Sequence, residues 1–501
     1  MARNNPSNVH DLLQDLPRGN LANERSPNTR FADPAVIKEL EGYRFNENKL
    51  WLGVIDGQVH EERLEHGRLT RYVTGGQPIG ISTDYHHTTI AGTRSGKGRA
   101  AIIPTLLTYK GSCLVIDIKG ELATITANRR QEMGQTVHVL DPFGVANVDE
   151  NLRKSFNPID IIADGANKNI IEDAELISDS LIIDSGGDKH WDDASRGLLS
   201  GVALHIATHR NYVDLRDLVT VREFIAKLNE DRVNEMKANP SANLAVEYAA
   251  HEFWDKTEGE RQSVLSTTRR HLRFLGYEAM QSALRGTSID LKELKRKPTT
   301  IYLCLPAMRM STCFAWFRLF VNQALAAMES EQTKPDVPVL FILDEANVLQ
   351  NLRSLQIAAG QLAGFSVKLW TIWQSIGQIK SNYQDHYESF LSGVLQFFGN
   401  SDVTTLEWIS KRLGQTTIKT PSQADVSLDD ATQKGLLGIS LANQVHSLMT
   451  AEEISRHFGR DDAKVRQLII NPSFAPMILQ RAYYDKHELL KSHLPPELLT
   501  I

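Results

Sequence analysis

Short runs of apolar residues recur along the chain, and each is followed by a turn of small or polar residues. Such runs indicate strands that are buried on both faces of a sheet, and their alternation with helical stretches predicts a mostly parallel α/β sheet. The predicted strands are Thr88–Ile90, Cys113–Asp117, Thr136–Pro142, Thr299–Pro306, Val339–Leu343 and Lys368–Trp373. A final strand pair is predicted at Gln467–Ile470 and Pro476–Leu479.

The first predicted strand leads into a loop of small residues that contains a lysine. The candidate nucleotide-binding residues are Gly92, Thr93, Arg94, Ser95, Gly96, Lys97, Gly98 and Arg99. Small residues let backbone N–H groups close around phosphate oxygens, the following helix adds positive dipole charge, and Lys97 reaches the outer phosphates. The general phosphate-loop pattern has Gly at position 91 and Ser or Thr at 98, whereas this chain has Ala91 and Gly98. This stretch alone therefore leaves an ordinary strand-to-helix turn open.

A second signal lies far downstream, where the apolar strand Val339–Leu343 ends in Asp344 and Glu345. In a P-loop ATPase the first carboxylate holds Mg²⁺, directly or through a water, and the second polarises the attacking water. By chance the same pattern arises where a strand precedes an acidic helix start. Together with Lys97 it favours an ATPase that uses ATP and Mg²⁺, with Lys97 and Glu345 as catalytic residues and Asp344 at the metal.

Composition narrows the class of protein. A length of 501 residues suggests two or three domains, and 41% hydrophobic with 23% charged residues is ordinary for a soluble protein. The formal net charge of -6 excludes a basic nucleic-acid coat and requires any DNA contact to be local. Cys113, Cys304 and Cys313 all lie in apolar segments, which indicates reduced thiols. No run approaches the roughly 20 apolar residues that span a bilayer.

Several motifs follow one another in a recognisable order. They are His87, the Thr93–Gly98 loop, Pro104–Leu107, Asp117–Glu121 and Ser155–Pro158. Over residues 50–485 this order resembles the type IV secretion coupling proteins of the VirD4/TraG group. That family often has Gly-Pro before the T-R-S-G-K-G sequence, where this chain has Ala and Gly, and Gly at position 98 also occurs in the family.

The resemblance implies a RecA-like P-loop NTPase with a mostly parallel central sheet and an inserted all-α domain. Helical spacing in residues 159–290, with no convincing strand, supports the insertion. The expected domains are a flexible polar segment at 1–50, the nucleotide-binding domain at 51–158 and 291–485, the insertion at 159–290, and a C-terminal tail at 486–501. Residues 419–446 are polar and are expected to be mobile.

The resemblance also implies a function. Such a protein would bring a relaxase–DNA complex (the relaxosome with single-stranded DNA) or protein effectors to a type IV secretion channel, working with the channel's ATPases and inner-membrane components. It would act as a homo-hexamer whose ATP hydrolysis is stimulated by DNA. Relatives generally carry N-terminal transmembrane helices, whereas this chain has no apolar run of that length. We therefore expect a variant without them, cytoplasmic and peripheral to the bacterial inner membrane.

Two further site predictions rest on the resemblance. Gln374, at the end of the strand Lys368–Trp373, corresponds to a family Gln-Ser and is the candidate sensor of the γ-phosphate. Relatives can carry an arginine finger just before that strand, but Gln361–Phe365 contains no Arg. Arg353 and Arg412 are the candidates to reach a neighbour's nucleotide. Because a finger supplies roughly 10³–10⁵ in rate, a slow ATPase is expected without one.

Two alternatives stay open at this point. A non-hydrolysing docking adaptor of the same system would explain Ala91 and the missing finger arginine. A chromosome-type DNA translocase of the same superfamily is less consistent with the strand end Asp117–Glu121 and with the insertion after Pro158.

Overall fold

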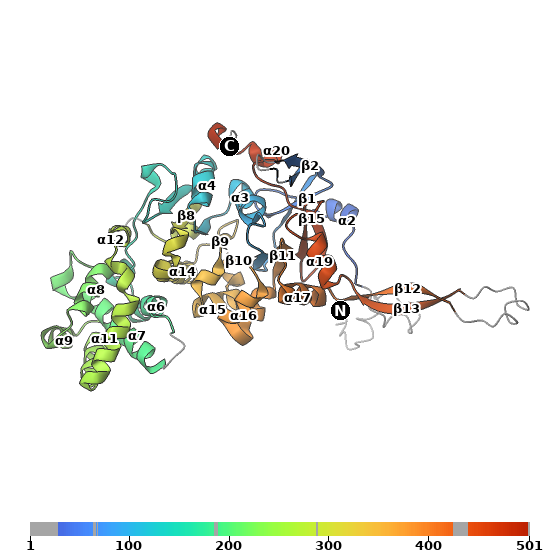
Figure 1. Ribbon diagram of the computed structural model, residues 1–501. Helices are drawn as coiled ribbons and strands as arrows, with labels where there is room; N and C mark the ends of the chain where they lie inside the picture. The colour runs from blue at the N-terminus through green and yellow to red at the C-terminus, as the bar shows by residue number, and fades with distance from the viewer. Residues whose placement is uncertain are drawn as a thin grey trace, which may run out of the picture.

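One large sheet organises the molecule (Figure 1). The computed structural model describes residues 29–63, 67, 69–184, 189–286, 289–423 and 439–498. The sheet has eleven strands in the order β4-β1-β15-β14-β11-β5-β10-β9-β6-β8-β7. Neighbours from β11 to β7 run parallel, whereas the strands from β14 to β4 pair antiparallel. The predicted α/β fold with a mostly parallel sheet is confirmed.

The parallel strands are the apolar runs of the sequence. They are β5 (His87–Ala91), β6 (Cys113–Asp117), β7 (Thr136–Leu140), β8 (Thr299–Cys304), β9 (Val339–Leu343), β10 (Val367–Trp373) and β11 (Val394–Phe398). In β9, Phe341 and Leu343 pack into one hydrophobic core while Leu340 and Ile342 pack into another. The continuous apolar pattern therefore reflects burial on both faces.

Helices from different parts of the chain cover the two faces. On one face lie α3 (Ile103–Thr108) and α4 (Glu121–Glu132). On the other lie α14 (Met310–Ser330), α16 (Ile376–Tyr383) and α17 (Val403–Leu413). No helix in the described part of the chain combines the length and the apolarity that crossing a membrane requires.

The antiparallel edge joins distant parts of the chain. Its strands are β1 (Leu50–Ile55), β4 (Gln77–Ile81), β14 (Arg466–Ile470) and β15 (Met477–Gln480). The predicted strand pair near the C-terminus is confirmed, since Leu468 lies opposite Ile478. Val54 of β1 pairs with Gln480 of β15, so an early and a late segment complete the sheet together.

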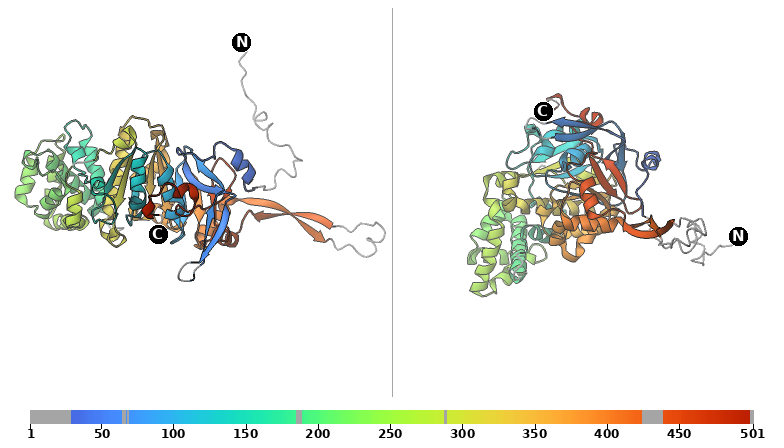
Figure 2. Two further views of the ribbon diagram at one scale, coloured as in Figure 1. Left: turned by 90° about the horizontal axis from the view of Figure 1, so that it is seen from above. Right: turned by 45° about the vertical axis from the view of Figure 1, so that its right-hand side comes forward.

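Between β7 and β8 the described residues form helices and no strand. The longer helices are α6 (Ile170–Leu181), α7 (Lys189–Thr208), α8 (Leu218–Ala226), α9 (Glu230–Lys237), α10 (Ala245–Trp254) and α11 (Glu258–His271). They form a group to one side of the sheet, drawn in green in Figures 1 and 2. This arrangement agrees with the inserted all-α domain of the fold class; its exact boundaries stay a prediction.

Segments near both ends of the described chain pack against the body of the molecule. The described part of the segment expected to be flexible, residues 29–50, packs against the body: α2 (Pro34–Glu39) buries Ile37 completely. In the expected C-terminal tail, α20 (Glu488–Lys491) buries Leu490 beside Trp51. These contacts concern the described parts of the two segments, and the predicted domain bounds at 1–50 and 486–501 stay predictions. Residues 1–28 of the predicted flexible segment lie outside the described residues.

A two-stranded ribbon also departs from expectation. β12 (Gln415–Gln423) pairs with β13 (Ile439–Ser447) and projects away from the body in both views of Figure 2. The sequence predicted a mobile polar stretch over residues 419–446; strands occupy its two ends, and the part between them lies outside the described residues. The sequence of β12, QTTIKTPSQ, is mostly polar and contains a proline, so it does not show the apolar pattern by which strands were predicted.

Helix α2 provides a matched test of the N-terminal packing. Ile37 is 0% exposed and its neighbour Val36 is 47% exposed. Ile37→Ala is expected to lower the free energy of unfolding by about 2–5 kcal/mol, and Val36→Ala by no more than about 0.5 kcal/mol. Urea denaturation of the two variants measures the difference. Equal losses would contradict the packing described for residues 29–50.

Candidate functional site

The candidate phosphate-binding loop connects β5 to a helix at the carboxyl edge of the sheet. The helix begins with a π-helical turn, η1 (Gly98–Ile102), and continues as α3. The predicted strand, loop and helix are thus present. Ligands of open α/β sheets bind at this edge, outside the carboxyl ends of parallel strands.

Contacts with Gly399 and Arg481 fix the conformation of the loop. Arg481 is completely buried and donates a hydrogen bond to the carbonyl oxygen of Ser95 at 3.1 Å. A Cβ atom on Gly92 would lie 2.4 Å from the carbonyl oxygen of Gly399, so only glycine fits there. Gly96 has φ +88°, in the region that favours glycine. The loop conformation is therefore fixed by β11 and by the segment after β15.

Lys97 lies against both carboxylates of the downstream strand. Its Nζ is 3.1 Å from Oδ1 of Asp344 and also forms an ion pair with Glu345. The side chains of Lys97 and Asp344 are each 17% exposed. Two stretches of chain that were linked only by hypothesis thus meet in space. Lys97 and Asp344 are close enough to contact one bound triphosphate, as the ATPase interpretation requires.

Gln374 completes the cluster. It follows β10, which lies between β5 and β9 in the sheet. Its Nε2 donates to Oε2 of Glu345 at 2.9 Å, and its Oε1 accepts a hydrogen bond from the hydroxyl of Thr93 at 3.4 Å. Gln374 therefore touches both the loop and the candidate catalytic carboxylate.

Glu345 adopts a backbone conformation that is unusual for a residue other than glycine. Its φ and ψ angles are 55° and 51°, in the left-handed region. Such strain costs of order 1–3 kcal/mol and is concentrated at functional sites. This left-handed residue connects β9 to the 3₁₀ helix that begins at Ala346.

The site holds more negative charge than its lysine balances. Burial raises the pKa of Asp344, although Lys97 acts in the opposite direction. Burial also raises the pKa of Asp117 to about 7, and the charge of Asp344 adds to this effect. Conversely, Asp344 and Glu345 raise the pKa of Lys97 above its usual value although burial opposes them. Carboxylate oxygens such as those of Asp117, Asp344 and Glu345 are the ligands that Mg²⁺ prefers, so the donor set fits Mg²⁺.

A cavity of about 750 Å³ opens in front of these groups, within the range that accommodates small ligands. The loop from Thr93 to Arg99 lines one part of it, together with Asp117, Asp344 and Glu345. Within the described part of the chain, the buried hydroxyl of Ser95 has no hydrogen-bond partner. An unpaired hydroxyl, an ammonium group and a carboxylate pair around one cavity fit a magnesium nucleotide.

Other lining residues were missed by the sequence analysis. They come from β3 (Leu69–Thr74) and from the C-terminal part of the chain: Arg71, Arg460, Asp461, Arg481 and Tyr483. The predicted nucleotide-binding residue Arg99 is engaged with that part, because it forms an ion pair with Asp485 and lies 4.4 Å over the Tyr483 ring. These positions carry no recognisable sequence motif. Predicting them would have required knowing that β3 and the C-terminal part of the chain meet at the cavity.

The two arginine-finger candidates lie outside the cavity. Arg353 is the first residue of α15 (Arg353–Gln361), and Arg412 lies in the last turn of α17. Both are exposed, and neither lines the cavity. A role for either therefore still requires a neighbouring subunit and stays a prediction.

One other cluster of metal-ligand types occurs in the described part of the chain. His205, His209 and Glu235 place their ligand atoms within 4.8 Å of one another. However, Nδ1 of the buried His205 accepts a hydrogen bond at 3.1 Å from the Asn239 amide, whose oxygen is fixed by the Ser241 N–H. A neutral ring that accepts at Nδ1 carries its proton on Nε2. The nitrogen near Glu235 is therefore a donor, and the cluster is a polar contact within the helices.

Comparisons with known proteins agree with this geometry. The model of a family described as type IV secretory system conjugative DNA transfer matches residues 42–500. Protein VirD4 of Rhizobium radiobacter is 26% identical over 81% of this chain, and conjugal transfer protein TraG of Escherichia coli is 29% identical over 66%. The aligned regions span 58% and 55% of the lengths of these two relatives.

Solved structures share the fold. The plasmid coupling protein TrwB in complex with ADP and Mg²⁺ aligns with a TM-score of 0.63 at 13% sequence identity, covering 91% of this chain and 94% of that one. A trigonal form of the bacterial conjugative coupling protein TrwBdeltaN70 in complex with sulphate aligns with a TM-score of 0.64 at 14% identity. Because the identities are low, these likenesses establish the RecA-like fold alone.

The two glycines of the loop provide a matched test of its packing. Gly92→Ala is expected to destabilise the chain by about 1–3 kcal/mol, because its Cβ would overlap the Gly399 carbonyl. Gly98→Ala meets nothing within 4 Å and is expected to be neutral or to stabilise by up to about 1 kcal/mol. Thermal unfolding without nucleotide measures both. A Gly98→Ala loss as large as that of Gly92→Ala would contradict the described packing.

Proposed function

The chain belongs to the type IV secretory system conjugative DNA transfer family, and from that premise we propose that it is an ATP-hydrolysing coupling protein. It recruits a relaxase–DNA complex or protein effectors to a type IV secretion channel and helps to drive their transfer. The observation that carries the hydrolytic part is the contact of Lys97 with Asp344 and Glu345 at the mouth of the cavity.

Each residue of the cluster has a proposed role. Lys97 exchanges its two carboxylate partners for the outer phosphate oxygens when nucleotide enters, so its charge is neutralised in both states. Asp344 would hold Mg²⁺, directly or through a water, and an ion held there would neutralise charge on the phosphates. Freed from Lys97, Glu345 accepts hydrogen bonds from the attacking water and orients it. The remaining loop residues surround the phosphates with backbone N–H groups.

Gln374 is proposed as the sensor of the γ-phosphate. Its amide already bridges Glu345 and Thr93, so a change at either group alters its hydrogen bonds. Gln374 is followed by Ser375, which caps α16 by accepting a hydrogen bond from Gln378. A shift of the amide therefore acts directly on the start of a helix that packs on the sheet.

The proposed setting follows from the family. The names of relatives refer to conjugal transfer and type IV secretion, which supports DNA–relaxase complexes or protein effectors as cargo and the channel's ATPases and inner-membrane components as partners. Hydrolysis at interfaces of a homo-hexamer, with Arg353 or Arg412 reaching a neighbour's nucleotide, is part of the same proposal. The protein would work on the cytoplasmic side of the bacterial inner membrane.

The catalytic roles are tested by Mg²⁺-dependent ATPase assays with and without single-stranded DNA, which is expected to raise the rate. Glu345→Gln is expected to lower kcat by about 10²–10⁴-fold while ATP still binds, because only the orientation of water is lost. Lys97→Ala is expected to abolish hydrolysis and to weaken binding, because it removes the charge that meets the phosphates. Removal of Mg²⁺ with EDTA should abolish turnover in the unmodified protein.

Lys168→Ala is the matched control, since Lys168 is exposed in a loop of the helical insertion. It should retain turnover, and all variants should retain the fold by circular dichroism. Background turnover in the unmodified protein, together with intact cargo binding, would select the non-hydrolysing docking adaptor. DNA transfer that survives Lys97→Ala in cells would refute the proposed motor function.

A further inference from the structure

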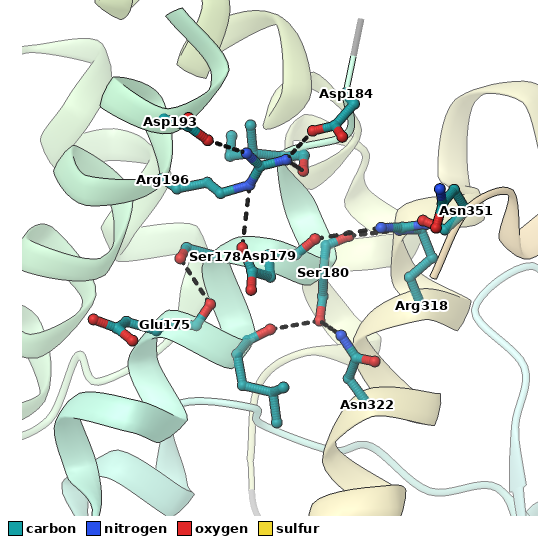
Figure 3. A network of polar contacts seen from close by, with 12 residues as sticks. Glu175, Ser178, Asp179, Ser180, Asp184, Asp193, Arg196, Arg318, Asn322 and Asn351 are labelled. Carbon is teal, nitrogen blue, oxygen red and sulfur yellow. Dashed lines mark hydrogen bonds and ion pairs between the residues drawn. The ribbon is translucent and has the colours of Figure 1, made fainter. Parts of the chain in front are cut away.

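A buried arginine lies between the helical insertion and the catalytic segment. Arg318 of α14 is 4% exposed and donates hydrogen bonds to the carbonyl oxygens of Ser180 at 3.1 Å, Leu349 at 2.6 Å and Asn351 at 2.9 Å. Within the described residues no carboxylate lies at ion-pair distance from its guanidinium group. Its charge is thus satisfied by backbone carbonyl groups alone (Figure 3).

Two of these three carbonyl groups belong to helix ends, and that of Asn351 lies in the loop between η6 and α15. Ser180 is in the last turn of α6, and Leu349 is the last residue of the 3₁₀ helix η6 (Ala346–Leu349). The last carbonyl groups of a helix have no partner within it and carry the negative end of its dipole, so a cation is favourable there. Burial lowers the pKa of Arg318 to about 10, which leaves it charged at neutral pH. One cation therefore stabilises both helix ends at once.

A second side chain of α14 repeats the same connection one turn later. Asn322 donates from Nδ2 to the hydroxyl of Ser180 at 2.6 Å, and its Oδ1 accepts a hydrogen bond from the hydroxyl of Ser354 in α15. Residues four apart lie on one face of a helix. We call Arg318 and Asn322 together the α14 bridge: each contacts α6 on one side and the segment Leu349–Ser354 on the other.

The catalytic side of the α14 bridge begins directly at Glu345. The N–H of Val348 donates to the carbonyl oxygen of Glu345 at 2.9 Å, so one 3₁₀ turn connects the candidate catalytic residue to Leu349. Glu345 and Gln350 both have positive φ angles, 55° and 52°, so the turn is bounded by two left-handed residues. The turn between Glu345 and Leu349 is thus short and closed by a backbone hydrogen bond.

On the insertion side, α6 is tied to the long helix α7. Arg196 of α7 forms an ion pair with Asp179 of α6 at 3.1 Å and with Asp184, just after α6 (Figure 3). The aspartates are more than half exposed, so each pair is worth little by itself, but together they align the two helices. Movement of the C-terminal end of α6 therefore reaches α7 as well.

We propose that Arg318 and Asn322 are positioning residues that make the turn after Glu345 and helix α6 move together, so that the nucleotide state of the site sets the position of the helical insertion. This inference rests on the proposed nucleotide site and extends it to the helices. By linkage, a partner that holds the insertion in one position would change nucleotide affinity by the same factor with which nucleotide changes the partner's affinity.

The experiment compares hydrogen–deuterium exchange of the full chain with and without the non-hydrolysable analogue ADPNP and Mg²⁺. In the unmodified protein, ADPNP is expected to slow exchange both in residues 346–354 and in α6. In Arg318→Met the change in α6 should be lost, and kcat should fall by about 2–30-fold with little change in KM. Arg318→Lys, which keeps the charge but fewer donors, should restore part of the response.

Gln323→Leu is the matched control. Gln323 is a buried neighbour on α14 that donates to the carbonyl oxygen of Pro158 at 3.0 Å, and among the described residues it forms no hydrogen bond with the 349–354 segment. It should retain the response of α6. If Arg318→Met does not fold, Ser354→Ala removes one hydrogen bond of the α14 bridge from an accessible position and should weaken the response.

The outcomes separate this inference from the proposed hydrolysis. If ADPNP binds but α6 of the unmodified protein does not respond, or if Gln323→Leu loses the response as Arg318→Met does, the α14 bridge does not couple the two parts. If α6 responds while ATP turnover is at background, the coupling stands and the proposed hydrolysis fails. Absence of ADPNP binding would overturn both.

Discussion

A charge balance between strands that are far apart in sequence organises the structure. The ammonium group of Lys97 follows β5, the carboxylates of Asp344 and Glu345 follow β9, and β10 lies between these strands in the sheet. Three charged groups with side chains that are largely buried are costly unless they compensate one another. The parallel register of β5, β10 and β9 ends these strands at one edge, and so the sheet itself fixes the distances on which the site depends.

Much of this arrangement was predictable from the sequence because parallel strands have a simple signature. An uninterrupted apolar run such as Val339–Leu343 is typical of a strand that is buried on both faces. The residues that bind ligands lie just after the carboxyl end of such a strand. The same reasoning located Gln374 after β10, where it bonds with Glu345. It could not locate Arg71, which lies in a separate two-stranded sheet that contains β3, or Arg481 and Tyr483, which follow β15 at the antiparallel part of the large sheet.

The contacts of α14 show a second limit of prediction from the sequence. Arg318 and Asn322 are polar residues on a face that otherwise packs into the hydrophobic core. Their spacing of four residues within an apolar stripe is the one local indication that the two side chains lie on the same face of the helix. Their partners, however, are mostly backbone carbonyl groups, which have no residue-specific signal at all. Deducing the connection between the turn after Glu345 and α6 therefore requires knowing where α6 and η6 end and where α15 begins.

The backing of the phosphate-binding loop by Arg481 has a consequence for biosynthesis. Arg481 follows Ser95 by 386 residues. At a translation rate of about 5–20 residues per second, the ribosome needs roughly 20–80 s to make the arginine after it has made the loop. For most of that interval β5 also lacks β10 and β11, which flank it in the sheet. The nascent chain therefore carries an unfinished pocket with open strand edges, and a competent nucleotide site arises only late in synthesis.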